Sequence, residues 1–176
     1  MKFAYADPPY YGYAKFYKGM HPEWEKPDQL SWHKDLIDRL SVEYSDGWAL
    51  SLTSGNLLDI LPLCPRDCRI GAWVKPFASY KPGVNPGYTW EPVIFRGGRK
   101  KRERTERTVR DHLACNITLQ KGLTGAKPAA FNQWICNLLG YRSGIDEMHD
   151  LFPGTNGMED YLTGKDIPLF KDIQLL

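Results

Sequence analysis

Short apolar runs, separated by stretches rich in glycine and proline, recur along the whole chain. Runs of this length with β-branched, aromatic or small apolar side chains are typical of buried strands. The predicted strands are residues 3–6, 47–52, 69–74, 91–95 and 147–151. The fourth follows a long turn-rich stretch, so we expect it to return antiparallel to the third, as a hairpin at one edge of the sheet.

Two longer stretches carry apolar side chains at the spacing of an amphipathic helix. The first starts at Asp28 or Ser31, either of which suits an N-cap, and runs to about residue 44. The second starts at Pro128, which suits a first helical turn, and stops at Gly140. The apolar positions predicted to pack on the sheet are Trp32, Leu36, Ile37, Leu40, Phe131, Trp134, Ile135, Leu138 and Leu139. Strands interleaved with helices predict one α/β domain over residues 1–176, with a mostly parallel sheet.

Three long polar segments, residues 11–27, 75–90 and 96–112, are broken by glycine or proline or dominated by charge, and are predicted to be loops. Loops at strand ends are where binding residues concentrate. The three segments are therefore candidate substrate-binding insertions. The alternative is that the first packs its aromatic side chains onto the body of the protein and that the second only shields the sheet.

The composition indicates a globular protein without a membrane segment. Apolar residues make up 42% of the chain and charged residues 25%, as in typical globular domains. No apolar run approaches the roughly 20 residues that a membrane span needs, and the chain enters its first strand directly, so we expect no signal peptide and a cytoplasmic location, in a prokaryotic or phage-infected host cell. The cysteines Cys64, Cys68, Cys115 and Cys136 lack the spacing of a zinc site, so we expect free thiols and no metal.

The net charge of +2 is small, but positive charge is concentrated in residues 96–110, RGGRKKRERTERTVR. A run of this kind can neutralise phosphates and bind nucleic acid. It can equally be a solvated loop. The candidate nucleic-acid contacts are Tyr88, in the preceding loop, and the basic residues Arg96, Arg99, Lys100, Lys101, Arg102 and Arg104.

The candidate chemistry begins with Asp7-Pro8-Pro9-Tyr10, directly after the first predicted strand. The prolines end the strand, because they cannot donate its hydrogen bonds. An acid and an aromatic ring are thereby fixed at the carboxyl end of a strand, where open α/β sheets bind ligands. Asp7 and the carbonyl of Pro8 can accept hydrogen bonds from the amine of a nucleobase, which frees the nitrogen lone pair. Tyr10 offers a face for stacking the base. The alternative is a proline-terminated strand with a surface acid.

A second turn, Asp150-Leu151-Phe152-Pro153-Gly154-Thr155-Asn156-Gly157, follows the last predicted strand. Its glycines allow the close backbone approach that a nucleoside-type cofactor needs. We expect the first and last strands to lie side by side, so that Asp7 and Gly154 face one cavity.

The two stretches together resemble the amino-methyltransferases that use S-adenosylmethionine, in which a DPPY motif is catalytic and an FxGxG-like turn holds the cofactor. Gly125-Ala126-Lys127-Pro128 matches a third motif of that family. The order, with the catalytic motif first and the cofactor turn last, is similar to that of the circularly permuted β-type adenine-N6 DNA methyltransferases and the phage adenine methylases.

The resemblance implies a Rossmann-like methyltransferase fold and methyl transfer from S-adenosylmethionine to the N6 amino group of adenine in DNA. The implied catalytic residues are Asp7, Pro8, Pro9 and Tyr10. The implied cofactor-binding residues are Asp7, Lys127, Asp150, Phe152, Pro153, Gly154, Thr155 and Asn156, with Lys127 reaching the carboxylate or ribose of the cofactor. Two alternatives remain open: methylation of adenosine in RNA, and a catalytically inactive nucleic-acid-binding subunit with the same fold.

The chain departs from the family after the glycine turn. The family continues with a helix and two further strands, whereas only residues 158–176 follow here. The resemblance therefore implies a trimmed sheet. Its exposed edge would be covered by residues 167–176, or by another chain in a homodimer or with a partner subunit. Asn156 also stands near where the family often has glycine.

Overall fold

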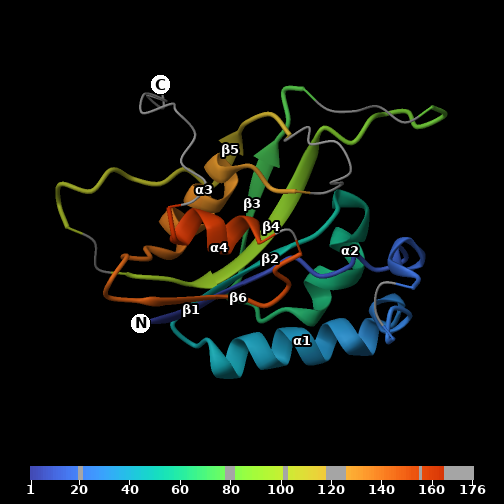
Figure 1. The fold of residues 1–176 in the computed structure, drawn as a ribbon, viewed down its shortest axis with the longest axis horizontal. Coiled ribbons are helices and arrows are strands. Elements are labelled where there is room, and N and C mark those ends of the chain that lie inside the picture. Colours follow the sequence, from blue (N-terminus) through green and yellow to red (C-terminus); the bar gives the residue numbers. More distant parts are fainter. Residues whose placement is uncertain (20–21, 78–81, 101–102, 118–125, 155, 165–176) are drawn as a thin grey trace.

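The computed structural model describes residues 1–19, 22–77, 82–100, 103–117, 126–154 and 156–164. The strands are β1 (Lys2–Ala6), β2 (Gly47–Ser51), β3 (Arg69–Val74), β4 (Trp90–Gly97), β5 (His112–Ala114) and β6 (Glu147–Asp150). They form one six-stranded sheet in the order β5-β3-β4-β2-β1-β6 (Figure 1). β1 pairs in parallel with β2 and β6, and β3 pairs in parallel with β5, whereas β4 is antiparallel to both of its neighbours.

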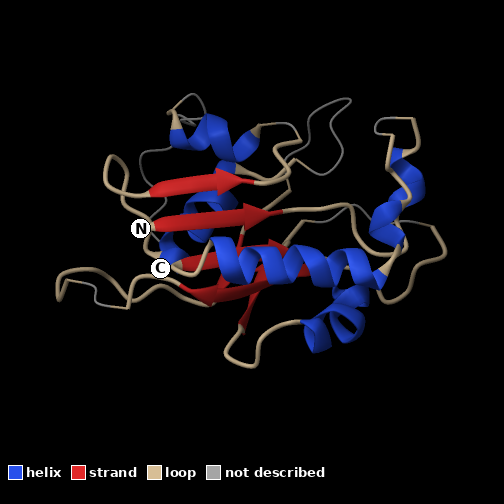
Figure 2. Ribbon diagram, turned by 90° about the horizontal axis from the view of Figure 1, so that it is seen from below, coloured by secondary structure: helices blue, strands red, loops and turns tan. Residues whose placement is uncertain are grey.

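Helices cover both faces of this sheet. They are α1 (Leu30–Glu43), α2 (Leu57–Ile60), α3 (Ala129–Leu139) and α4 (Gly157–Leu162). Because side chains alternate along a strand, Phe3 and Tyr5 of β1 pack in one core with α3 and α4, while Ala4 and Ala6 pack in the other with α1. The long helix α1 crosses in front of the strands in the turned view of Figure 2.

The predicted α/β class is confirmed, with a mostly parallel sheet, and the five predicted strands correspond to β1, β2, β3, β4 and β6. One difference concerns the edge next to the antiparallel pair of β3 and β4. The short strand β5 pairs with Ala72–Val74 on the outer side of β3, so the pair lies one strand in from the edge. Residues 167–176, expected to cover an edge, lie outside the described part of the chain.

The start of α1 also differs from the prediction. Its N-cap is Gln29, without a side-chain cap, so neither Asp28 nor Ser31 caps the helix. Asp28 closes a 3-10 turn directly before α1, and its carboxylate accepts the backbone N–H of Ala14 at 3.1 Å instead. The end of α3 agrees with the prediction, because Gly140 adopts the left-handed conformation, with φ of 69°, that terminates many helices.

The directions of the strands give the sheet two distinct edges. The carboxyl ends of β1, β2, β3 and β6 lie at one, together with the start of β4, and we call this the carboxyl edge. The opposite side, where β1, β2 and β6 begin and β4 ends, is the amino edge. No helix among the described residues is both long enough and apolar enough to cross a membrane.

Candidate functional site

Two segments far apart in the sequence border one cavity at the carboxyl edge. Residues 7–10 follow β1, and residues 150–154 end and follow β6, its parallel neighbour. The cavity has a volume of about 460 Å³, within the range of about 300–1,000 Å³ that is usual for small-molecule sites. Its lining consists of Tyr5, Asp7, Pro8, Pro9, Tyr10, Tyr17, Glu91, Lys127, Asn132, Asp150, Leu151, Phe152, Pro153, Gly154, Gly157 and Met158. The expected adjacency of the first and last strands is thus confirmed.

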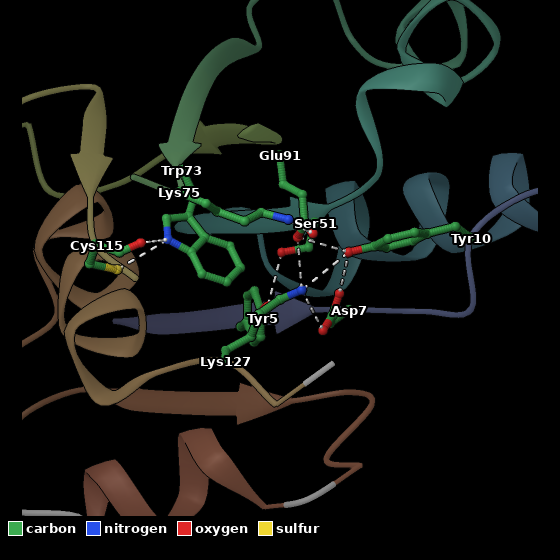
Figure 3. Close-up of polar contacts among 9 residues, drawn as sticks. All are labelled: Tyr5, Asp7, Tyr10, Ser51, Trp73, Lys75, Glu91, Cys115 and Lys127. Carbon is green, nitrogen blue, oxygen red and sulfur yellow. Dashed lines mark hydrogen bonds and ion pairs between the residues drawn. The ribbon is translucent and has the colours of Figure 1, made fainter. Parts of the chain in front are cut away.

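Four charged side chains meet beside this cavity, and three of them, Asp7, Glu91 and Lys127, line it (Figure 3). Lys127 Nζ lies 3.2 Å from Asp7 Oδ2 and 3.2 Å from Glu91 Oε2. Lys75 Nζ donates to the other oxygen of Glu91. The hydroxyl of Tyr10 lies 3.2 Å from Asp7 Oδ1, 3.4 Å from Glu91 Oε2 and 3.2 Å from Lys127 Nζ. Two carboxylates and two ammonium groups balance one another, so this charged cluster carries no net charge when all four are ionised.

The surroundings shift the pKa values of the cluster in different directions. Burial raises the pKa of Asp7, Lys127 opposes that shift, and the carboxylate of Glu91 adds to it. Burial acts upward on Glu91 too, but Lys127 and Lys75 together hold its pKa below the usual value. Burial lowers the pKa of Lys127, but Asp7 and Glu91 outweigh it, so the net pKa is raised. Lys127 therefore stays charged, while the surroundings favour the protonated form of Asp7 and the ionised form of Glu91.

The end of β1 explains how Asp7 and Tyr10 come to face each other. The strand stops at Ala6, directly before Asp7 and the two prolines, which cannot extend its ladder. Pro8 is buried, and the chain turns so that Tyr10 bonds back to Asp7. The side chain of Asp7 remains 22% exposed, so its carboxylate is accessible from the cavity.

The glycine turn after β6 is shaped by two left-handed residues. Gly154 has φ of 48° and Asn156 has φ of 60°; glycine and asparagine tolerate this region best. Asn156 therefore preserves the turn although it is not glycine. The backbone N–H of Phe152 donates to Asp150 Oδ1 at 3.1 Å and closes the bend. Burial raises the pKa of Asp150 to about 6; that N–H opposes the shift, and the carboxylates of Asp7 and Glu159 add to it.

Most of the predicted cofactor residues meet at the cavity, and Lys127 is among them. The residues of that set that line the cavity are Asp7, Lys127, Asp150, Phe152, Pro153 and Gly154. The ammonium group of Lys127 contacts the acids of the charged cluster, at the side of the catalytic motif. Thr155 lies outside the described residues. No group of three or more His, Cys, Asp or Glu side chains within the described ranges is placed to hold a metal.

Glu91 and Asn132 are among the cavity residues that were not predicted from the sequence. Glu91 joins the charged cluster from the start of β4. Asn132, on α3, is 1% exposed, and neither atom of its amide has a hydrogen-bond partner within the described residues. The one signal for Asn132 in the sequence is a polar residue beside Phe131 on the apolar face of a predicted helix.

The described basic residues of the predicted nucleic-acid set lie at the amino edge, opposite the cavity (Figure 1). β4 is antiparallel to β2, so the chain leaves it at Gly97, beside the start of β2. Arg96 pairs with Asp67 at 2.8 Å, and Arg99 bonds Asp146 and the carbonyl of Gly140. The exposed residues Lys100 and Arg104 follow in the same loop, whereas Lys101 and Arg102 lie outside the described residues. Among the described members of this set, only Tyr88 lies at the carboxyl edge, where it is 53% exposed just before β4.

No family model matches the chain, and no curated protein matches its sequence. Solved structures of similar fold include M1.HpyAVI in complex with SAM, with a TM-score of 0.58 and 14% identity; the match covers 93% of this chain and 77% of that chain. A second structure of M1.HpyAVI matches with a TM-score of 0.52 at 14% identity, over 92% of this chain and 75% of that one. At such low identity the likeness establishes the fold alone: the chain has the α/β fold of M1.HpyAVI, as expected from the resemblance in its motifs.

Proposed function

We propose that this protein transfers a methyl group from S-adenosylmethionine to the N6 amino group of adenine in DNA. The observation that carries the proposal is the shared cavity, in which the acid of the Asp7-Pro8-Pro9-Tyr10 motif and the glycine turn at Gly154 face the same space. The fold likeness to a SAM-bound protein supports the same cofactor for this chain. The resemblance of the motif, with Asp rather than Ser at its first position, favours adenine over cytosine as the target.

Several features of the cavity fit this cofactor. The unpartnered amide of Asn132 supplies donors and an acceptor, and buried polar groups of this kind normally have partners. Gly154 lets the backbone come close to a nucleoside. The carboxylate of Asp150 suits the ammonium of the methionine moiety. When bound, the cofactor supplies an electrophilic methyl group on a positively charged sulfur.

The residues of the charged cluster prepare the amine of the base. Asp7 and the carbonyl of Pro8 accept hydrogen bonds from N6, which draws the nitrogen toward tetrahedral geometry and frees its lone pair. Lys127 favours the ionised form of Asp7, the form that can accept both bonds. The hydroxyl of Tyr10 is held by its polar neighbours, which fixes the ring for stacking on the base. A proton leaves N6 after the new nitrogen–carbon bond has formed, so no strong general base is needed.

The proposal is tested by incubating the protein with methyl-labelled S-adenosylmethionine and DNA, or RNA of the same sequence, and digesting the product to nucleosides. We expect the label in N6-methyldeoxyadenosine. Label on RNA alone would assign the protein to RNA adenosine methylation. Absence of transfer, together with no heat of cofactor binding by calorimetry, would indicate an inactive nucleic-acid-binding subunit.

Replacing Asp7 by Asn tests the assigned role of the acid. Loss of a preorganised hydrogen-bond acceptor should lower kcat by about 100-fold or more, while the dissociation constant for S-adenosylmethionine stays within about tenfold, since the glycine turn is intact. Asp35→Asn, at an exposed position on α1, is the matched control and should leave both unchanged. Retained turnover in Asp7→Asn would remove Asp7 from this role.

A further inference from the structure

The large exposed aromatic side chains of the described residues all lie at one edge of the sheet. Each side chain in this set is at least 36% exposed: Tyr13, Phe16, Tyr17, Phe77, Tyr88 and Trp90. Five of the six belong to the segment after β1 or to the connection between β3 and β4, and Trp90 is the first residue of β4; all three places lie at the carboxyl edge. We call this set the aromatic rim. It lies at the same edge as the cavity, and one member, Tyr17, lines the cavity itself.

The part of the rim after β1 is held to the body of the protein. A 3-10 turn at Ala14–Tyr17 is anchored by Ala14, which is fully buried and donates its N–H to Asp28 at 3.1 Å. From this turn Tyr17 faces the cavity, whereas Phe16 is 59% exposed. The ring of Tyr13 stacks on that of Phe16, with centroids 6.1 Å apart and planes at 26°. A flat ring is thus presented at the surface on an anchored turn.

Positive charge accompanies these rings. Lys15 Nζ lies 5.6 Å from the ring centroid of Phe16, and Lys18 Nζ lies 5.8 Å from that of Trp24. Neither lysine makes an ion pair within the described residues. Alternating rings and unpaired cations suit a strand of nucleic acid, whose bases stack while its phosphates meet the lysines. The basic run at the amino edge lacks exposed rings, and its Arg96 and Arg99 are already bound to acids of the protein.

We infer that the aromatic rim binds the nucleotides that flank the target adenine, and that the substrate is a single-stranded segment of DNA. The inference rests on the proposed function and specifies its substrate. The faces of bases become available for stacking only when the strand is unpaired, and a target base must leave its stack to reach a cavity. Phe16, the most exposed ring of the rim, is the stacking platform, and Lys15 contacts the adjoining phosphate.

The test measures fluorescence anisotropy of a labelled single-stranded oligodeoxynucleotide that contains one adenine, and of the corresponding duplex. Phe16→Ala should raise the dissociation constant and KM for the single strand by about tenfold or more, the size expected for loss of one stacked base. The kcat at saturating single strand and the affinity for S-adenosylmethionine should be unchanged. Ile145→Ala, an exposed apolar residue at the amino edge, is the matched control and should change nothing. Arg104→Ala tests the alternative that the basic run at the amino edge binds the strand, and we expect it to weaken single-strand binding by less than about twofold.

Three outcomes would overturn the inference: Phe16→Ala binding as tightly as Ile145→Ala, Arg104→Ala weakening binding more than Phe16→Ala, or tighter binding of the duplex by the wild type. The methyl-transfer assay separates this failure from failure of the proposed function. If the wild type methylates DNA but Phe16→Ala has no effect, only the aromatic rim is refuted. If Phe16 governs binding but no methyl group is transferred, the aromatic rim stands and the enzymatic proposal fails.

Discussion

At the scale of single residues, Asn132 stands out among the described residues because both polar atoms of its buried amide lack a hydrogen-bond partner. Its neighbours Phe131 and Ile135 pack in the core, yet its amide lies buried at the cavity without a partner in the described part of the chain. An unpaired buried amide destabilises a folded protein by roughly 1–3 kcal/mol. A ligand that completes the hydrogen bonds of Asn132 would account for a polar side chain at this buried position.

Replacing Asn132 by Leu separates binding from folding. The affinity for S-adenosylmethionine should fall by about tenfold or more, because the bonds to the amide are lost. The melting temperature of the unliganded protein should stay the same or rise, because an unsatisfied polar group is removed. Calorimetry and thermal unfolding measure the two quantities. A variant that binds the cofactor normally would show that Asn132 does not contact it.

The raised pKa of Asp150 predicts a pH dependence of cofactor affinity. With a pKa of about 6, the carboxylate is protonated at lower pH and no longer attracts an ammonium group. The affinity for S-adenosylmethionine should therefore be about tenfold lower at pH 5 than at pH 7. In the unliganded protein, the folded-state pKa lies above the unfolded value of about 3.9, so Asp150 makes the free energy of unfolding decrease as pH rises from about 4 to about 6.

Calorimetric titrations between pH 5 and pH 8 test this dependence. Asp150→Asn should bind weakly at every pH in that range and should lack the step near pH 6. A wild-type affinity that is constant over the range would contradict the assignment of Asp150 to the cofactor.

At the scale of elements, Asp146 joins three segments at the amino edge, just before β6. Its carboxylate, 1% exposed, bonds the amino group of Met1, Arg99 and the backbone N–H of Arg142. These bonds outweigh the upward effect of burial and hold the pKa of Asp146 at about 2. The contact ties β1, the loop after β4 and the turn before β6 together. It also gives Arg99 a structural role.

Asp146→Asn should lower the free energy of unfolding by about 3 kcal/mol, because it leaves Arg99 without its buried partner. The pKa of Asp146 is depressed, so its stabilisation is present above the unfolded value of about 3.9 and is lost as pH falls toward 2. Urea unfolding at several pH values measures both effects. Asp67→Asn breaks the exposed pair with Arg96 and serves as the control. Equal stability of the two variants would contradict this account.

Hydrophobic periodicity and the residues that end an element predicted most strands and helices correctly. Elements that lack such local signals were missed. Strands such as β1 and helix α3 carry clear periodicity and clear stop signals, and their predicted bounds agree with the structure within two residues. β5 has three residues between two long loops, too few to show alternation. The N-cap of α1 was mispredicted because Asp28 is used by the backbone of Ala14, a contact that spans 14 residues.

In the candidate site too, the sequence predicted residues that lie within local motifs and missed those brought together from distant parts of the chain. Asp7 and Tyr10 were recognisable because they lie within one short motif, and the glycine turn for the same reason. Glu91 was not recognisable from the sequence, because its partner Tyr10 is 81 residues away along the chain. The basic run was predicted to bind nucleic acid from its charge, which says nothing of where the run lies, and the antiparallel direction of β4 carries it to the amino edge.

At the scale of the whole molecule, the two edges of the sheet carry different features. The carboxyl edge gathers the charged cluster, the glycine turn and the aromatic rim, while the amino edge closes the fold through Asp146 and its ion pairs. This division follows from the topology, because β1 and β6 are parallel neighbours and bring both motifs to the same end. The central claim is that one cavity between them holds the cofactor beside Asp7.

A crystal structure of the protein with S-adenosylhomocysteine tests that claim most directly. The account predicts one product molecule in the cavity, with its nucleoside against the turn at Gly154, a polar group bonded to Asn132 and its sulfur toward Asp7. A molecule bound elsewhere on the protein, or no binding by calorimetry at saturating concentration, would contradict it.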